Sequence, residues 1–401
     1  MRTIGRIDKN IPSPEWIQSL RQSFPVEKEM DRVFTRKLQR RNGPGYVPVS
    51  LETLCNSLKS LLLTELTDPF EIRDARWLSG GASKLQVSLK LDWHPPGSSR
   101  TVTPMVIRME PAESIVETSR LREFQVIKAV QGVLPVPQVY WIDEDGRHFP
   151  YPAIVYGFAD GVAKPTGSLS NVTGLGTNYG PGLRGALGKQ YVEHLAALHT
   201  WDWSGADLGA FDVPAVGRAA VELQLNWWMR VWEEDSNRDI PLMRVAAAWL
   251  RENMPETDRL SMIHGDYRAG NFLFTEHDQR ITAWLDWELA HLGDFHEDLA
   301  YTTLPFLGHL SEDGSHLLAS GMMPVEALYE RYEKAANLAV DMKRIDYYHV
   351  FHAWRSVVIV IGSAYRPARN GKTHQDLLLN WIMGAGYTIL DFLRAKLEEV
   401  A

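Results

Sequence analysis

Residues 263–286 read IHGDYRAGNFLFTEHDQRITAWLD and contain the densest group of reactive polar side chains in the chain. Two apolar, β-prone runs, 271–274 and 281–285, flank a polar turn, and this pattern predicts a hairpin. A hairpin would bring Asn271 and Asp286 together at its open end. We therefore expect the polar side chains of this stretch to converge on one place.

The polar residues of this stretch are the types that phosphoryl transfer needs. Asp266 is a candidate base that orients a hydroxyl group and accepts its proton. Asn271 offers a neutral oxygen and Asp286 a charged one, and both suit Mg²⁺. Arg268, two residues after Asp266, points the same way in an extended loop and is placed to meet a phosphate. His264 is expected to hold the loop through hydrogen bonds. Together they predict phosphoryl transfer from a magnesium-bound nucleotide triphosphate.

A different pattern occupies residues 71–160, where short alternating runs predict a small sheet. Strands are expected at 72–78, 85–92 and 104–109, followed by a helix over 111–130 and two further strands. The turn between the first two strands contains Gly80, Gly81 and Ser83. Paired glycines let a backbone approach phosphate oxygens, and Ser83 adds a hydroxyl. A glycine turn without a ligand is the commoner use of such a segment, so both interpretations stay open.

Arg108 and Glu123 form the second notable pair of this region. Arg108 ends an apolar run, and Glu123 heads the apolar stripe of the following predicted helix. A carboxylate beside a buried face requires a partner, because an unpaired buried charge is costly. Arg108 is the expected partner. The pair is either an ordinary ion pair at a helix–sheet junction or a cation held over phosphates by a helix glutamate.

The rest of the chain is predicted to be mainly helical. Residues 1–70 look like a helical extension with a packing role, and the glycine-rich segment 161–182 should be an irregular loop. We therefore divide the chain into an extension over 1–70, a β-rich lobe over 71–159 and a helical lobe over 160–401.

Composition excludes several other classes of protein. The net charge of −8 argues against general binding to nucleic acid or to a membrane surface. Cys55 is the only cysteine, which rules out an intrachain disulfide and a multi-cysteine zinc site. The first residues lack the apolar core of a signal peptide, and no apolar run is long enough to span a bilayer. We expect a cytoplasmic protein.

Six segments, in this order, resemble the aminoglycoside phosphotransferase-like kinases, which share a protein-kinase-like fold with choline kinases. The segments are LSGGAS (78–83), VIR (106–108), REF (122–124), VLPVP (133–137), IHGDYRAGN (263–271) and LDWELAHLGDFHEDLA (285–300). Within that family the chain is most similar to the phosphotransferase domains fused to acyl-CoA dehydrogenases and to their free-standing bacterial relatives.

The resemblance implies a bilobal α+β fold with a small β-rich N-lobe and a larger helical C-lobe. It implies ATP and Mg²⁺ as cofactors, with Asp266 as catalytic base and Asn271 and Asp286 as metal ligands. Arg108 takes the position of the family's phosphate-binding lysine and is paired with Glu123.

The resemblance also implies a hinge near Tyr156 and Phe158, whose backbone meets adenine. Asp294 and Asp298 match carboxylates that brace the metal-binding loop. Phe295 stands where the family usually has proline, which leaves the local turn open but not the chemistry.

The phosphate acceptor is a small hydroxylated molecule whose identity stays open. Residues 350–375, a candidate pocket wall, contain cations but no acid: Arg355, Arg366, Arg369 and Lys372. This favours an anionic or apolar acceptor, such as a hydroxyacyl-CoA thioester, over a polycationic aminoglycoside. A solvated helix end explains the same cations equally well.

Three classes of function remain. The first is a small-molecule kinase, with an antibiotic kinase as its variant. The second is a nucleotide-binding pseudokinase or interaction module, which the intact trio Asp266, Asn271 and Asp286 opposes. The third is a metal-dependent hydrolase, for which a second histidine-rich motif is missing.

Overall fold

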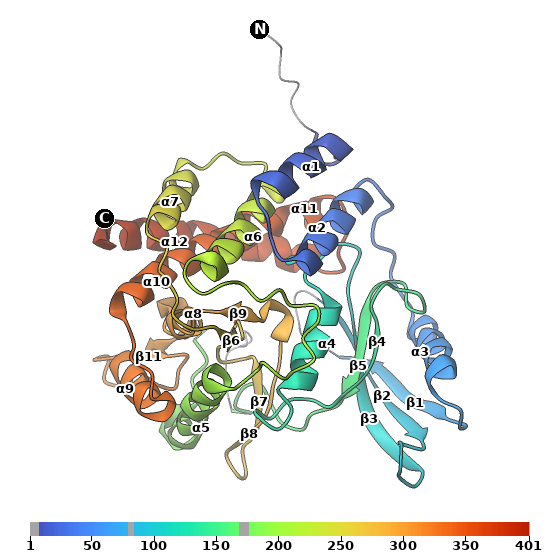
Figure 1. The fold of residues 1–401 in the computed structure, drawn as a ribbon. Coiled ribbons are helices and arrows are strands. Elements are labelled where there is room, and N and C mark those ends of the chain that lie inside the picture. Colours follow the sequence, from blue (N-terminus) through green and yellow to red (C-terminus); the bar gives the residue numbers. More distant parts are fainter. Residues whose placement is uncertain (1–7, 79–83, 168–175, 401) are drawn as a thin grey trace.

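The computed structural model describes residues 8–78, 84–167 and 176–400 (Figure 1). Its largest sheet is antiparallel, with the strand order β1-β2-β3-β5-β4. The strands are β1 (Glu71–Trp77), β2 (Leu85–Trp93), β3 (Thr101–Met109), β4 (Val139–Asp143) and β5 (Ala153–Gly157).

A helix covers each face of this sheet. Helix α3 (Leu51–Glu65) packs its leucines on one face, where Met105 and Ile107 of β3 are buried. Helix α4 (Arg120–Ala129) lies on the opposite face (Figure 1). Because side chains alternate along a strand, Arg108 points to the face opposite Ile107 and thus toward α4.

Helix α4 is shorter than the sequence predicted. The prediction of a helix over 111–130 is wrong at its start, because α4 begins at Arg120. Ser119 caps the helix through its side-chain oxygen. The segment before it follows an irregular path, and the amide of Glu113 donates instead to the carbonyl of Lys372 at 3.1 Å. Tertiary contacts thus replace the first helical turns.

The remainder of the chain is helical, with short strands around the polar stretch. Its helices are α5 (Gly180–Thr200), α6 (Ala219–Asp235), α7 (Pro241–Glu252), α8 (His296–Thr302), α9 (Val325–Ala336), α10 (Met342–Val357), α11 (Tyr365–Arg369) and α12 (Asp376–Val400), with a π-helical segment over Val358–Ser363 and short 3₁₀ turns over Trp287–Leu289 and Pro305–Leu307. Its strands are β6 (Ser261–Ile263), β7 (Phe272–Thr275), β8 (Arg280–Trp284), β9 (His291–Gly293), β10 (His309–Leu310), β11 (Leu317–Ala319) and β12 (Met323–Pro324). The predicted α+β, bilobal arrangement is confirmed.

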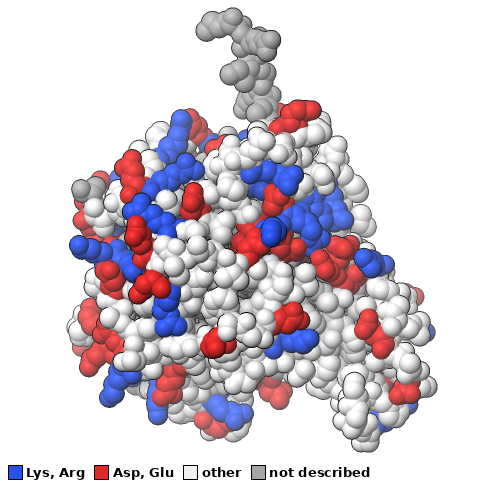
Figure 2. Space-filling view, viewed as in Figure 1, with Lys and Arg blue, Asp and Glu red and all other residues white. Residues whose placement is uncertain are grey.

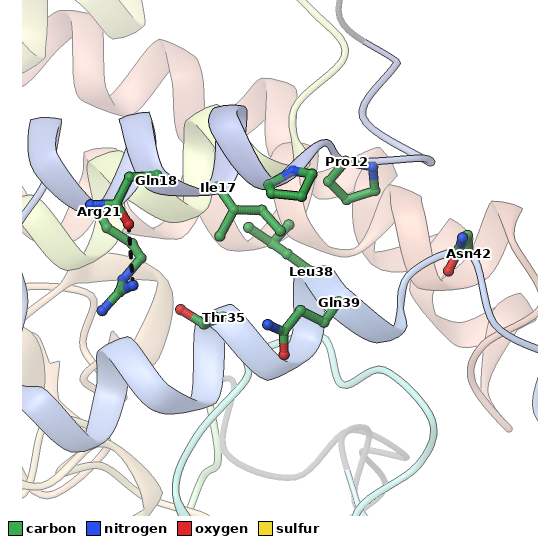
Figure 3. Close-up of a pocket in the computed structure, with 9 residues that line it drawn as sticks. Pro12, Ile17, Gln18, Arg21, Thr35, Leu38, Gln39 and Asn42 are labelled. Carbon is green, nitrogen blue, oxygen red and sulfur yellow. Dashed lines mark hydrogen bonds between the residues drawn. The ribbon is translucent and has the colours of Figure 1, made fainter.

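Two N-terminal helices lie over the helical part, beside α6 (Figure 1). They are α1 (Pro14–Ser23) and α2 (Lys28–Arg40). A cavity of about 330 Å³ opens between them (Figure 3). It is lined by Pro12, Pro14, Ile17, Gln18, Arg21, Thr35, Leu38, Gln39 and Asn42. None of the candidate site residues reaches this cavity.

The visible surface mixes both signs of charge (Figure 2). Lys and Arg lie among Asp and Glu without one extended field of either sign on this face. Within the three described segments, no helix combines the length and apolar character needed to cross a bilayer.

Candidate active site

The polar stretch begins in a tight turn after β6. Gly265 adopts a φ of +79°, a backbone conformation that glycine accepts and other residues rarely do. A Cβ atom at this position would lie 2.7 Å from the carbonyl oxygen of Leu289. Glycine is therefore required between His264 and Asp266, and the turn presses the Asp266 loop against the segment that follows Asp286.

Asp266 is held by two neighbours from its own loop. Its Oδ1 accepts a hydrogen bond from Arg268 Nε at 2.9 Å, and its Oδ2 accepts one from Asn271 Nδ2 at 2.6 Å. Asn271 Nδ2 also donates to the backbone oxygen of Asp266 at 2.8 Å. The amide nitrogen of Asn271 is thereby committed, so its side-chain oxygen is the atom left to face a cation.

The predicted hairpin is confirmed as β7 and β8. At its open end the amide of Leu285 donates to the carbonyl of Asn271 at 2.8 Å, which places Asp286 beside Asn271. Asp286 itself adopts a left-handed conformation, with a φ of +60° and a ψ of +49°. Such a conformation is uncommon for a non-glycine residue, although aspartate adopts it more readily than most, and strained residues tend to cluster at functional sites. The side chain of Asp286 is 40% exposed, more than its neighbours in the cluster.

Arg108 joins the sheet to this loop. Its guanidinium lies 3.2 Å from Glu123 of α4 and also bonds Asp286. The expected pairing with Glu123 is therefore present. Burial disfavours the charged form of Arg108, but the surrounding carboxylates outweigh this effect and hold its pKa well above the ordinary value. One buried cation thus lies between the two lobes and faces the candidate metal ligand.

Three further charged residues belong to this cluster and were not identified from the sequence. Glu288 lies 3.2 Å from Arg108, 3.1 Å from Arg120 and 3.5 Å from Lys84. Lys84 is buried and also donates to Ser114 Oγ at 2.9 Å. Arg120 bonds Glu123 three residues along α4. Glu288 in LDWE and the spacing of Arg120 and Glu123 are visible in the sequence, whereas nothing local marks Lys84.

Glu288 is a largely enclosed carboxylate among these cations, with 13% of its side chain exposed. Burial raises its pKa, but Lys84, Arg108 and Arg120 outweigh burial and lower the pKa to about 2. A carboxylate with a depressed pKa stabilises the fold above its unfolded pKa and loses that effect as the pH falls toward the folded pKa.

We expect Glu288→Gln to lower the free energy of unfolding by roughly 3 kcal/mol at pH 7, since the pKa falls from 4.5 to about 2 and one pKa unit corresponds to about 1.4 kcal/mol. The difference between wild type and variant should shrink from about pH 4.5 down to pH 2. Urea denaturation across this pH range measures it. Glu330→Gln, an exposed change on α9, serves as control. A difference that stays constant with pH would contradict this account of Glu288.

His264 holds the loop, as expected. Its Nδ1 accepts from the amide of Asp266 at 3.3 Å, and its Nε2 lies 3.0 Å from the carbonyl oxygen of Leu285. Burial lowers its pKa, so the ring is neutral, with one nitrogen accepting and the other donating. His264 thus ties the Asp266 loop to the residue before Asp286.

Asp298 of α8 binds the same loop through its backbone amides. Its carboxylate accepts from the amides of His264 at 2.7 Å and Gly265 at 2.8 Å. His199 Nε2 lies 3.2 Å from the same carboxylate. All three groups are buried, so Asp298 fixes the start of the Asp266 loop.

The turn around Phe295 keeps the backbone that proline would impose. Phe295 has a φ of −58°, and its ring stacks on Tyr332 with centroids 5.8 Å apart. Asp294 accepts from His296 Nδ1 at 2.6 Å and lies 3.5 Å from Arg344. Proline could therefore adopt the same φ at this position, while bracing of the metal-binding loop by Asp294 stays a prediction.

The remaining nucleotide-side predictions have mixed outcomes. Gly80, Gly81 and Ser83 fall within 79–83, outside the described residues. Tyr156 is buried, and burial raises its pKa to about 12. Phe158 is 39% exposed, and its amide donates to the carbonyl of Pro104 at 2.9 Å. Contact between adenine and this backbone stays a prediction. The amide of Phe158 already donates to Pro104 and so is not available to adenine in this conformation.

Three of the four cations over 350–375 are buried, which contradicts both the cationic pocket wall and the solvated helix end for these residues. Arg355 donates to the carbonyl of Gly265 at 2.9 Å, and Arg366 donates to that of Asp235 at 3.0 Å. Lys372 donates to the carbonyl of Pro44 at 2.6 Å. All three side chains are buried, so they stabilise the fold and do not form an exposed anion-binding surface. The charge argument for an anionic acceptor loses its support.

Comparison with known proteins identifies the family. The protein-family model described as "Phosphotransferase enzyme family" matches residues 87–346, more than half of the chain. Acyl-CoA dehydrogenase family member 11 of Homo sapiens is 28% identical over 346 residues, which cover 80% of this chain and 42% of that protein. The chain thus spans less than half the length of this relative.

Solved structures share the fold. A Ralstonia eutropha protein named as an aminoglycoside phosphotransferase superposes with a TM-score of 0.58 at 21% identity, covering 85% of this chain and 98% of that one. Plasmodium vivax ethanolamine kinase gives a TM-score of 0.52 at 12% identity, covering 98% of both chains. The chain belongs to the phosphotransferase enzyme family and has the bilobal kinase-like fold.

Proposed function

We propose that this protein is a kinase that transfers the terminal phosphoryl group of ATP, bound with Mg²⁺, to a hydroxyl group of a small molecule. The observation that carries the proposal is the convergence of Asp266, Asn271 and Asp286 with the Arg108–Glu123 pair. A phosphoryl-transfer site needs few covalent participants, and its main tasks are orientation and charge stabilisation.

The donor set is consistent with magnesium. Asn271 and Asp286 offer two hard oxygen ligands, and Mg²⁺ at nucleotide sites usually takes one or two protein oxygens together with phosphate oxygens and water. In the described residues no group of three or more His, Cys, Asp or Glu side chains is arranged to hold a metal ion on its own. We infer that the metal is recruited with the nucleotide. When bound, it would neutralise charge on the phosphate oxygens.

The side chains of this chain then have distinct roles in the proposed reaction. Asp266 orients the acceptor hydroxyl and takes its proton as the new bond from oxygen to phosphorus forms and the bond to the leaving ADP oxygen breaks. Arg268, bonded to Asp266, is placed to meet the transferring phosphoryl group. Arg108 and Lys84 supply positive charge on the nucleotide side of the cluster.

The support for the acceptor class comes from the names of the relatives. The acyl-CoA dehydrogenase relatives are longer than this chain, and their name favours an acyl-CoA thioester that carries a hydroxyl group. An aminoglycoside acceptor is the alternative within the same class of enzyme. A nucleotide-binding module without catalysis is the alternative of another class.

Formation of ADP should depend on both an acceptor and a divalent cation. We expect turnover with Mg²⁺ and a hydroxyacyl-CoA thioester, little turnover with aminoglycosides, and loss of activity in excess EDTA that is restored by added Mg²⁺. A coupled ADP assay against both acceptor panels measures this. Binding of ATP without turnover on any acceptor would favour the non-catalytic module, and turnover with aminoglycosides alone would overturn the acyl-CoA assignment.

A further inference from the structure

Helix α2 lies between the two lobes and is bonded to both. On the side of the helical lobe, Asp31 lies 2.6 Å from Arg230 of α6. Lys37 lies 2.7 Å from Glu234 of the same helix, and both side chains are buried. These pairs fix α2 to α6, so the N-terminal helix is firmly attached to the C-lobe.

On its other side α2 reaches α4, the helix that carries Glu123. Glu27, the residue before α2, is buried and accepts from Arg122 Nη1 at 2.6 Å. Arg122 Nη2 donates to the carbonyl of Ala290 at 2.9 Å, four residues after Asp286 in the chain. One guanidinium therefore joins the N-terminal segment, α4 and the segment that follows the candidate metal ligand.

The start of α4 has a second attachment to the same segment. Glu29 of α2 bonds Ser119 Oγ, and that oxygen also caps α4 by accepting from the amide of Arg122 at 3.3 Å. Arg32 holds Glu29 in place at 2.8 Å. Figure 2 shows Lys and Arg intermingled with Asp and Glu over the region where α2 lies in Figure 1.

The connection between β3 and α4 is bonded to α2 as well. Arg36 lies 3.9 Å from Glu110, the residue after β3. Glu110 in turn lies 3.3 Å from Arg120, which bonds both Glu123 and Glu288. Charges on α2 are therefore continuous with those that surround Arg108.

Adjacent residues of a helix point about 100° apart, so neighbouring side chains of α4 contact different parts of the protein. Arg122 points toward Glu27, whereas Glu123 points toward Arg108 on β3. A shift of α4 away from α2 would move Glu123 relative to Arg108. The position of the candidate phosphate-binding cation thus depends on a segment remote from it in sequence.

We propose that residues 27–41, here named the α2 clamp, position α4 and thereby set the Arg108–Glu123 pair, with Glu27 as a positioning residue. The effect on nucleotide use rests on the proposed kinase function, whereas the effect on α4 does not. The clamp is more than a packing extension, because it bonds α4, the β3–α4 connection and the residue Ala290 in one continuous network.

Two variants test the clamp. Glu27→Gln keeps the shape of the side chain and removes its charge, which weakens the bond to Arg122. Leu328→Ala, a buried change in α9, serves as a control that lowers stability without touching α2 or α4. Both are compared at a temperature where thermal denaturation finds each variant folded.

Amide hydrogen exchange gives the readout that needs no activity. We expect faster exchange in residues 120–129 for Glu27→Gln and wild-type exchange there for Leu328→Ala. The proposal of the α2 clamp would be wrong if amide exchange in residues 120–129 were unchanged in Glu27→Gln, or if it rose equally in Leu328→Ala.

Kinetics give the second readout. We expect the KM for ATP to rise about fivefold or more in Glu27→Gln, with the KM for the acceptor unchanged. Equal changes in both KM values would count against positioning of the nucleotide side. Faster exchange in α4 of Glu27→Gln, combined with a wild type that turns over no acceptor, would support the α2 clamp and contradict the proposed kinase function.

Discussion

Asp266→Asn is expected to lower kcat by a factor of about 10² to 10⁴, the range typical for loss of a general base. The variant keeps the size of the side chain and one acceptor oxygen, so the bond from Arg268 Nε is retained. It loses the charge that orients the acceptor hydroxyl and takes its proton. The contact with Asn271 changes as well, because two amide groups then face each other where an amide now donates to a carboxylate.

The measurement is steady-state ADP formation with saturating acceptor, together with calorimetric binding of ATP and Mg²⁺. We expect nucleotide affinity within a few-fold of wild type, since the proposed role of Asp266 is to orient the acceptor and not to bind the nucleotide. Asp278→Asn, in the exposed turn between β7 and β8, is the matched control and should retain activity. A variant at position 266 that keeps wild-type kcat would remove Asp266 from the chemistry and favour the non-catalytic module.

The sequence predicted the grouping of Asp266, Asn271 and Asp286 because these residues are close in the chain, while their catalytic roles stay a prediction. The hairpin that joins Asn271 to Asp286 follows from two β-prone runs around a polar turn. The pair Arg108–Glu123 follows from alternation along a strand and from the cost of an unpaired buried carboxylate. In both cases the local pattern fixes which face a side chain occupies.

Partners that are distant in the chain could not be predicted in the same way. Arg366 bonds the carbonyl of Asp235, and Lys372 bonds that of Pro44, so charges that looked available are already satisfied. A run of like charges reveals no such partner. The same reason explains why Lys84 escaped notice: its burial beside Glu288 depends on the contact between two lobes.

The contacts made by the helices of residues 1–70 could not be predicted from the sequence of that segment. Its helices contain no reactive motif, yet α3 completes the core on one face of the sheet, while α2 bonds α4 and α6. Apolar spacing predicts that a helix packs, but it does not state against which element. The roles of these helices follow from tertiary contacts alone.

Asp298→Ala is expected to lower the free energy of unfolding by about 3–5 kcal/mol, because three buried hydrogen-bond donors lose their shared acceptor. Two amides, those of His264 and Gly265, and the ring of His199 would lose their acceptor in a buried place. An unsatisfied buried donor costs about 1–3 kcal/mol each. Because these amides begin the Asp266 loop, activity should fall together with stability.

The pH dependence distinguishes loss of charge from loss of shape. Burial raises the pKa of Asp298, but hydrogen bonding and attraction from His199, with the contributions of His264, outweigh it and leave the pKa below the ordinary value. The stabilisation is therefore present above the unfolded pKa of about 4 and lost as the pH falls through the folded pKa. We expect the difference in unfolding free energy between wild type and Asp298→Asn to shrink below about pH 4.

Urea denaturation of wild type, Asp298→Asn and Asp298→Ala measures both effects. Asp298→Asn keeps one acceptor oxygen and should be less destabilised than Asp298→Ala at neutral pH, because one of the two backbone amides retains its partner. Equal destabilisation by the two substitutions at neutral pH would mean that charge alone holds the loop. A small effect of both would mean that the loop geometry depends instead on Gly265 and on the bond from His264 to Leu285.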